Sequence, residues 1–363
     1  MDERLKFFLL LNYVNANKSS AAKFFAKSDD VRELWRPTRT DVAADVVSEK
    51  SLAALRKAND TAWAENELER AEKMGISVMT IDDDNYPDDL ANLKDAPLIL
   101  YWKGKAEKFP DTLKVSVVGT RRMSAYGRDV SRMMGRMCGE NDIALISGGA
   151  WGVDGTSQNE CCDAGGATFA ILGTGVDIVY PAANRTLFEK ISSCGALVSE
   201  FPIGSKGLPW RFPQRNRIVA ALAQKTIVVE APMKSGSMIT ARLALELGKE
   251  VWAVPGQIFN SNSQGTNRLI YDGAYPFVDE ETFLASCGIS QKKKPSEDIP
   301  ENLTDDERNI INALHENGTM PVDSIAAAVG MTCADILKYI TMLSAKGYVY
   351  MSAAGRYSLK KNL

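Results

Sequence analysis

The sequence predicts an α/β fold built on a mainly parallel sheet that is wound on both faces. Five short apolar runs, typical of buried strands, alternate with helical patterns, and each leads into a loop containing small residues. These runs cover residues 114–118, 143–146, 167–172, 226–230 and 251–254. In such sheets ligands bind beyond the carboxyl ends of the strands, so we expect the five loops to share one functional edge.

Residues 1–74 precede this sheet and are predicted to form a small helical domain. Apolar residues recur in them at helical spacing, and Pro37 separates two of the segments. The expected helices cover residues 5–12, 20–26, 29–35 and 51–74.

The central domain is assigned to residues 75–287, in which two further strand-like runs, 75–80 and 97–104, are expected to extend the sheet. Glycine lets backbone N–H groups approach an anion, and a helix N-terminus adds partial positive charge. Several such loops on one edge predict a long groove for a polyanion rather than a single phosphate site. The candidate residues in the first two loops are Gly119, Thr120, Arg121, Ser147, Gly148, Gly149 and Ala150.

A basic and aromatic segment at residues 210–217 adds side chains that suit single-stranded nucleic acid. Arginines pair with phosphates while aromatic rings stack on bases. The alternative is an ordinary helix start, with Phe212 packed inward and its arginines in solvent. The candidates in this segment and at the next helix start are Phe212, Arg215, Asn216, Arg217, Ser235, Gly236 and Ser237.

The end of the chain is predicted to be a separate domain at residues 303–363, joined by a charged, proline-containing linker at 288–302. Thr304 and Glu307 form a capping-box pattern that opens the first of three helices, and a hairpin follows them. This order describes a winged helix. Its third helix carries only Lys338 and Lys346 as basic residues, so contact with protein is favoured over contact with DNA.

Composition limits the function classes. A length of 363 residues favours two or three domains, and a net charge of -3 leaves DNA binding to local basic residues and backbone amides. The six cysteines contain no C-x-x-C pair and are interpreted as reduced thiols. The apolar run at residues 7–11 is too short for a signal peptide core or a membrane span. We therefore expect a soluble, cytoplasmic protein with no membrane partner.

The familiar catalytic and nucleotide-binding motifs are absent from this sequence or incomplete in it. His315 is the only histidine and falls outside the glycine loops, which excludes Ser-His-Asp, Cys-His and most zinc chemistry. A phosphate-loop motif is absent, and the Gly173–Gly175 turn lacks the third glycine of a dinucleotide site. Asp154 is expected to accept backbone N–H bonds in its own loop, although an acidic pair with Glu230 stays open. No catalytic residue, metal or cofactor is therefore expected.

Ordered motifs along the chain resemble the DNA-processing protein A family (DprA, also called Smf) over about residues 75–285. They begin with Tyr86-Pro87, Val118–Arg121 and Ser147–Ala150, followed by Gly152–Asp154. The later motifs are Gly173–Asp177, Tyr180-Pro181, Glu200, Phe212–Arg217, Glu230-Ala231, Ser235–Ala241, Val254–Gly256 and Gly273-Ala274.

The resemblance implies an extended Rossmann-like fold that binds and protects single-stranded DNA, forms a homodimer and loads the RecA recombinase in natural transformation. It implies no catalytic reaction, and it implies that Arg121 and residues 212–217 line a DNA groove whose glycine loops hold phosphates. Trp151 and Ala182 stand where relatives carry basic residues, and Gln158 stands where histidine is common. Arg185, one helical turn beyond Ala182, is a candidate to replace the missing lysine.

Two other functions stay open at the level of sequence. One is a nucleotide-acting phosphoribohydrolase of the related Rossmann-like superfamily, whose members place a glutamate just after a glycine-rich turn. The comparable turn here, residues 235–242, contains no carboxylate. The other is a sensor that binds a small nucleotide signal in the same groove.

Overall fold

A computed structural model describes residues 2–35, 46–60, 62–289, 303–351 and 355–359. The chain forms two compact units, Met1–Ile289 and Ser290–Leu363, and each is described by itself. Most of the expected linker lies outside the described residues. The expected boundary at residues 74 and 75 falls within the first unit and stays a prediction.

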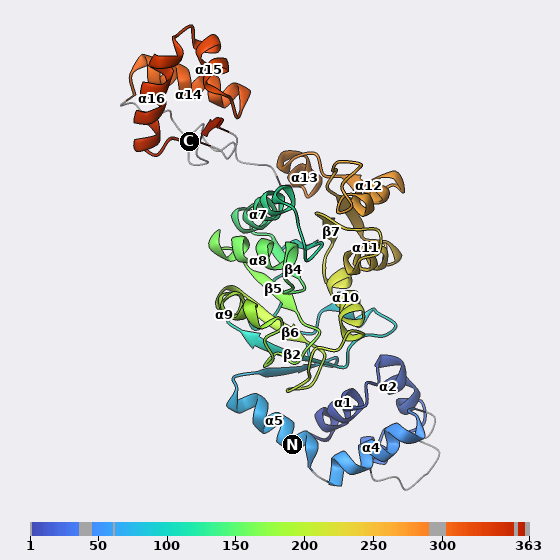
Figure 1. Cartoon of the computed structure of the whole chain (residues 1–363). Helices are drawn as coiled ribbons and strands as arrows, with labels where there is room; N and C mark the ends of the chain where they lie inside the picture. The colour runs from blue at the N-terminus through green and yellow to red at the C-terminus, as the bar shows by residue number, and fades with distance from the viewer. Residues whose placement is uncertain (1, 36–45, 61, 290–302, 352–354, 360–363) are drawn as a thin grey trace. The chain divides into compact units, whose positions relative to one another are not determined.

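The first unit is built around one nine-stranded sheet with the order β1-β2-β6-β5-β4-β3-β7-β8-β9 (Figure 1). Along this order, every pair of neighbouring strands from β6 through β5, β4, β3, β7 and β8 to β9 is parallel. The pairs β1 with β2 and β2 with β6 are antiparallel. The mainly parallel α/β sheet predicted from sequence is confirmed. The strands are β1 (Ser77–Thr80), β2 (Ile99–Gly104), β3 (Lys114–Val118), β4 (Ala144–Ser147), β5 (Thr168–Ile171), β6 (Ala196–Ser199), β7 (Lys225–Val228), β8 (Glu250–Ala253) and β9 (Tyr275–Pro276).

The five apolar runs coincide with β3, β4, β5, β7 and β8, and the two earlier runs form β1 and β2 at one edge. The prediction missed β6, which lies between β2 and β5. Its sequence, Ala-Leu-Val-Ser, is short and is followed by Glu200 and Phe201 rather than by a glycine loop. The signal used to find the other strands is therefore absent there.

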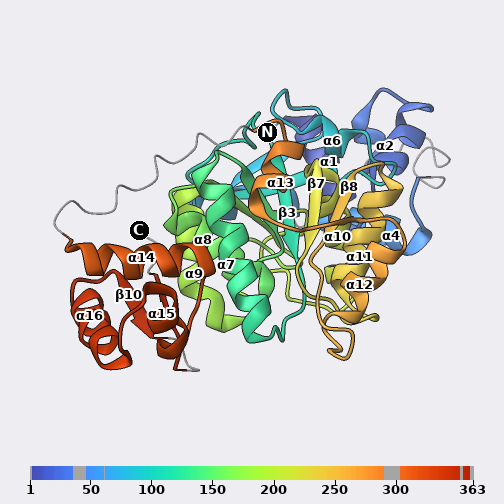
Figure 2. The same cartoon turned by 90° about the horizontal axis from the view of Figure 1, so that it is seen from above.

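Helices cover both faces of the sheet (Figures 1 and 2). One face carries α7 (Ala125–Glu140), α8 (Val153–Asp163) and α9 (Arg185–Cys194). The other carries α10 (Arg211–Leu222), α11 (Gly236–Glu246) and α12 (Gln264–Tyr271). Short helices in the connections are α6 (Asp88–Ala91), η2 (Ala182–Asn184) and α13 (Glu280–Ser286).

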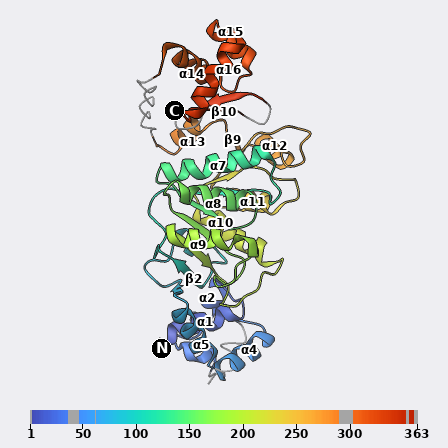
Figure 3. The same ribbon diagram turned by 60° about the vertical axis from the view of Figure 1, so that its left-hand side comes forward.

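The N-terminal helices lie against the β1–β2 end of the sheet (Figure 3). They are α1 (Glu3–Tyr13), α2 (Lys18–Phe25), η1 (Val31–Leu34), α4 (Glu49–Asp60) and α5 (Trp63–Lys73). Phe7, Phe24 and Leu55 are fully buried in a cluster that also contains Tyr101 of β2. The single helix predicted over residues 51–74 is wrong, because α4 and α5 are separate and Ala62 adopts a left-handed φ of 52°.

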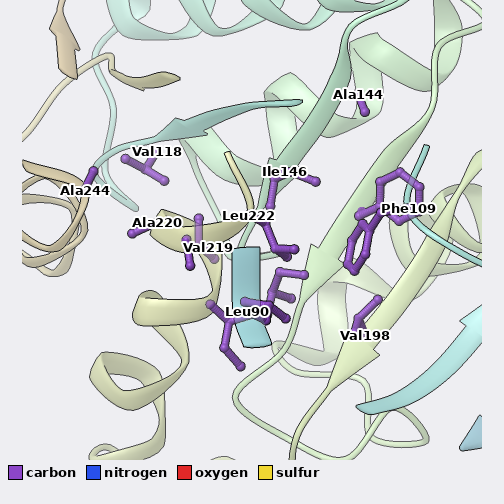
Figure 4. Close-up of a cluster of buried hydrophobic side chains, with 14 of the residues drawn as sticks. Leu90, Phe109, Val118, Ala144, Ile146, Val198, Val219, Ala220, Leu222 and Ala244 are labelled. Atoms are coloured by element: carbon purple, nitrogen blue, oxygen red, sulfur yellow. The ribbon is translucent and has the colours of Figure 1, made fainter. Parts of the chain in front are cut away.

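The core under α10 fixes the part of the fold that positions the candidate site. Ile218 to Leu222 of α10 are buried, and they join Leu90, Ile146 and Val198 in one cluster (Figure 4). Burying a side chain of this size stabilises the fold by about 1.5–3 kcal/mol. The first turns of α10, which carry residues 211–217, are therefore anchored by the buried remainder of the helix.

The second unit contains α14 (Asp305–Asn317), α15 (Val322–Val329), α16 (Cys333–Ala345) and the hairpin β10 (Val349–Met351) with β11 (Tyr357–Leu359). The predicted order of three helices and a hairpin is present, and the capping box between Thr304 and Glu307 is confirmed. No single helix among the described residues is long and apolar enough to span a bilayer. Helices α15 and α16 reach the length and apolar composition of a membrane span only when taken together, and the pair is bent by 104°.

The cysteines differ from the prediction at one pair. Cys162 of α8 and Cys194 of α9 form a disulfide across 32 residues, whereas Cys138, Cys161 and Cys287 are free. The interpretation of all six cysteines as reduced thiols is therefore wrong for this pair. Helices α8 and α9 pack side by side, a proximity that spacing in the sequence does not reveal.

Candidate nucleic-acid interface

Loops that follow β3, β4 and β7 meet the start of α10 at one edge of the sheet and enclose a hollow of about 580 Å³, which we call the loop groove. The prediction grouped five loops at one edge, and three of them line this groove. Gly173 and Thr174 of the loop after β5 line an adjoining inner pocket, whereas Pro255 and Gly256 after β8 line neither hollow. The predicted residues that line the loop groove are Gly119, Thr120, Arg121, Gly148, Ala150, Phe212, Arg215, Asn216, Ser235, Gly236 and Ser237.

Arg121 and Phe212 form the central contact of the loop groove. The guanidinium carbon of exposed Arg121 lies 5.4 Å from the centre of the Phe212 ring, within the range of a cation–π interaction. The ring centre of Tyr180 also lies 5.4 Å from that of Phe212. Together they bound an inner pocket of about 120 Å³, which also reaches Trp151 and Arg215. Cation and aromatic rings thus stand together on the groove wall.

Arg215, Gly148 and Asp154 make a buried floor. The Gly148 N–H donates to Oδ2 of Asp154 at 3.1 Å, which confirms the predicted loop-holding role of that carboxylate. Nη1 of Arg215 donates to the Ile171 carbonyl oxygen. Burial raises the pKa of Asp154 and lowers the pKa of Arg215 to about 10. Arg215 is therefore a charged group at neutral pH, sitting just beneath the glycine backbone that lines the groove.

Arg217 is engaged within the protein rather than in the groove. Its Nη1 and Nη2 donate to the two carboxylate oxygens of Glu200, both at 2.7 Å, and Nε lies 3.0 Å from Oδ2 of Asp95. Burial acts to lower the pKa of Arg217, but the charge and hydrogen bonds of Glu200 together with the charge of Asp95 outweigh it, and the pKa is raised. The carboxylate of Glu230 is engaged elsewhere and accepts the Ser124 N–H at 2.8 Å.

Other predicted residues hold the loops without lining the groove. The Ser147 hydroxyl donates to the Val117 carbonyl oxygen at 2.6 Å, and the Gly149 N–H donates to Oε1 of Gln158 at 3.0 Å. Gln158 is fully buried, so its role is to position this loop. Arg185 is exposed at the start of α9 but does not line the loop groove.

Sequence reasoning missed an adjoining basic surface, which we call the arginine hollow. It measures about 870 Å³ and shares Arg121 with the loop groove. Arg122, Arg128 and Arg132 also line it, and Trp151, which is 58% exposed, stands where it meets the inner pocket. The spacing of Arg128 and Arg132, one turn apart on α7, was the available signal.

The fold and these hollows define a Rossmann-like α/β protein with a basic, glycine-lined groove at its strand ends. The sequence profile of the DNA recombination-mediator protein A family matches residues 77–288, more than half of the chain. The chain belongs to this family, as the resemblance predicted.

Curated relatives and solved structures agree with this membership. Protein Smf of Synechocystis is 30% identical over 326 residues, covering 80% of this chain and 82% of the relative. DNA processing protein DprA of Streptococcus pneumoniae is 41% identical over 206 residues, covering 56% and 71%. The X-ray structure of the S. pneumoniae protein has a TM-score of 0.65 at 31% identity and covers 76% of this chain and 95% of that one.

A further structure is that of DNA processing protein A from Helicobacter pylori, described for its unique single-stranded DNA binding mode. It has a TM-score of 0.54 at 31% identity and covers 58% of this chain and 95% of that one.

Proposed function

We propose that this chain is a non-enzymatic single-stranded DNA-binding protein that protects incoming DNA and loads the RecA recombinase in transformation and recombination. The observation that carries the proposal is the pairing of Arg121 with the ring of Phe212 at a groove lined by glycine loops. Cations contact phosphates and aromatic rings stack on bases, and neither contact depends on the base sequence of the DNA. The single-stranded DNA binding mode of the H. pylori relative supports the same ligand.

The arginine hollow supports a ligand longer than one nucleotide. It continues from the loop groove through Arg121 and Arg122, which line both hollows, and adds Arg128 and Arg132 of α7. One of these, Arg132, lies 3.5 Å from Glu160, and both side chains are at least partly exposed. Because exposed ion pairs are worth little, a phosphate competes readily for this guanidinium.

The two alternatives receive less support. A phosphoribohydrolase needs an available acid, but Asp154 is buried and holds Gly148, and the turn at 235–242 has no carboxylate. A nucleotide sensor would use the loop groove, whose volume of about 580 Å³ lies within the roughly 300–1,000 Å³ typical of small-molecule sites. The basic surface extends beyond this volume into the arginine hollow of about 870 Å³, which favours a longer ligand.

Protein contact remains our proposal for the C-terminal unit. Lys338 lies on α16 and Lys346 follows its last residue, and Nζ of Lys346 is 2.6 Å from Oε1 of Glu307 and is therefore occupied. Leu337, Met342 and Met351 are each more than 40% exposed and offer apolar surface to a protein partner. Assembly of RecA on DNA coated with single-strand-binding protein, with and without residues 303–363, tests this role.

A homodimer is also proposed, with an apolar surface around α12 as its interface. Phe259 is 94% exposed, Tyr271 80%, Ile258 72% and Val278 69%, which is unusual for side chains of this kind. A second copy covering them would remove this area from water. Sedimentation equilibrium decides the point, since a monomer at micromolar concentration would contradict it.

The main test compares full-length protein and Arg121→Ala on single-stranded and duplex oligonucleotides by fluorescence anisotropy. The wild-type protein should prefer the single strand, and its affinity should fall with added salt. Losing one charge-assisted contact of about 1.5–3 kcal/mol should weaken binding by about tenfold or more, with an unchanged melting temperature. Equal affinity for blunt duplex, or nucleotide cleavage in a parallel assay, would refute the proposal.

A further inference from the structure

A fourth hollow lies between the N-terminal helices and the start of α10. This aromatic crevice measures about 250 Å³. Tyr13 of α1 and Trp63 of α5 contribute to one wall. Phe201, in the loop after β6, and Trp210 and Arg211, at the start of α10, contribute to the other.

Aromatic rings on the two walls remain open to solvent. The Tyr13 and Trp63 rings contact each other with centroids 4.5 Å apart, yet Tyr13 is 42% exposed. On the other wall Trp210 packs edge-on against Phe201 at 6.3 Å and is 49% exposed. Tyrosine and tryptophan surfaces that line one hollow and stay half in water are suited to stack on a flat ring.

Arg211 adds a cation to this aromatic surface. Its guanidinium carbon lies 4.7 Å from the Phe201 ring centre and 5.3 Å from the Trp210 ring centre. Nη1 donates to the Lys206 carbonyl oxygen at 2.8 Å, but Nε has no hydrogen-bond partner among the described residues. The protein thus leaves part of the hydrogen-bonding capacity of this guanidinium unused, although burial lowers the pKa of Arg211 and makes its charge costly.

The crevice and the loop groove lie on either side of the start of α10. Pro209 and Phe212 line the loop groove, whereas Trp210 and Arg211, which lie between them in sequence, line the crevice. A strand that passes Phe212 in the groove therefore needs to cross this helix start to reach Trp210.

The charge around the crevice fits a polyanion. Lys206 and Arg211 lie at or beside its rim, and Lys206 is exposed. The carboxylate of Glu200 is neutralised by Arg217, and the buried Glu67 accepts the Ile203 N–H at 2.7 Å. Neither acid therefore presents a free charge to a ligand there.

We propose that the aromatic crevice is a second contact site for single-stranded DNA. Trp210 and Tyr13 stack on a nucleobase and Arg211 contacts the adjoining phosphate, so that the strand held in the loop groove continues into the crevice. This inference rests on the proposed function and names a further part of the DNA path. It predicts that bases beyond the groove add affinity through the N-terminal helices.

The test compares the full-length protein on oligothymidylates of about 5 and about 20 nucleotides, one near the lower end and one beyond the upper end of the roughly 4–16 nucleotides of common single-strand sites. Trp210→Ala should weaken binding of the long oligonucleotide by about 5- to 100-fold and change the short one by less than about twofold. Trp210→Phe keeps a ring and should restore most of the loss. Leu245→Ala removes an apolar side chain of α11 that is 50% exposed and lines neither hollow, so it should leave binding of both oligonucleotides unchanged.

Arg121→Ala separates failure of this inference from failure of the proposed function. If the wild-type protein binds neither oligonucleotide, the proposed function is wrong. If Arg121→Ala weakens both but Trp210→Ala and Tyr13→Ala weaken neither, the groove stands and the second site is refuted. Melting curves of each variant establish that it is folded, and half-exposed positions such as Trp210 are expected to tolerate substitution.

Discussion

Arg217→Ala provides a sharp test of how the arginines at the start of α10 divide their roles. The Arg217 and Glu200 side chains are only 11% and 7% exposed and share two hydrogen bonds of 2.7 Å. Removing the arginine leaves Glu200 as an uncompensated buried charge, which costs about 3–5 kcal/mol. We therefore expect the substitution to act on folding and not directly on DNA.

The expected change in melting temperature follows from the size of the first unit. Its roughly 290 residues have an unfolding entropy near 0.6 kcal/mol/K, at about 2.1 cal/mol/K per residue. A loss of 3–5 kcal/mol then lowers the melting temperature by about 5–8 °C. Affinity for single-stranded DNA, measured well below the transition, should stay within about twofold of wild type.

A double variant supplies the control. Arg217→Met combined with Glu200→Leu replaces both charges with apolar groups, and such replacements of buried pairs are often neutral. It should recover more than half of the lost melting temperature in calorimetry. The reasoning fails if Arg217→Ala melts like wild type while DNA affinity falls tenfold, because Arg217 would then contact the ligand.

Three further changes test other parts of the first unit. Gly148→Ala would place a Cβ 2.5 Å from Nη1 of Arg215, so we expect about 1–3 kcal/mol of lost stability in chemical denaturation. Burial raises the pKa of Glu67, so the stability it contributes is present at low pH and lost as the pH rises through that raised pKa. Glu67→Gln should therefore melt like wild type below about pH 4.3 and at a higher temperature near pH 8. Ala182→Lys adds an exposed cation beside the arginine hollow and should steepen the salt dependence of single-strand binding by about 0.7.

Each of these has a clear contrary result. Gly236→Ala is the matched control for Gly148→Ala, because its added Cβ meets only Nδ2 of Asn216 at 3.9 Å; equal losses would remove the steric argument. A constant difference between Glu67→Gln and wild type across the pH range would show that Glu67 does not titrate abnormally. An unchanged salt slope for Ala182→Lys would show that this position does not face DNA.

Local patterns predicted the strands well because each buried strand is apolar and most end in a glycine loop. Features that depend on contacts between residues far apart in the sequence could not be predicted in this way. The pairing of Arg217 with Glu200 joins α10 to the end of β6, a strand whose short sequence carries little signal of its own. The break between α4 and α5 depends on the backbone of Ala62, and alanine gives no sequence warning of a left-handed conformation.

The candidate site was predictable in outline for the same reason. Loops at the carboxyl ends of parallel strands must meet, so the order of strands and loops along the chain is enough to group Gly119, Gly148 and Ser235. Which arginine faces the groove depends on helix phase and on buried carboxylates. This is why Arg121 lines the loop groove, Arg215 lies in its floor and Arg217 turns inward.

Neither edge strand of the nine-stranded sheet exposes a long row of unpaired backbone N–H and C=O groups. At one border β1 is only four residues long and α5 packs against it, and at the other β9 consists of Tyr275 and Pro276, whose proline lacks an N–H. A long bare border would recruit strands from other chains and lead to aggregation. The N-terminal helices therefore also protect the protein against aggregation. Removing them would uncover β1 and favour insoluble protein even if every groove residue remained in place.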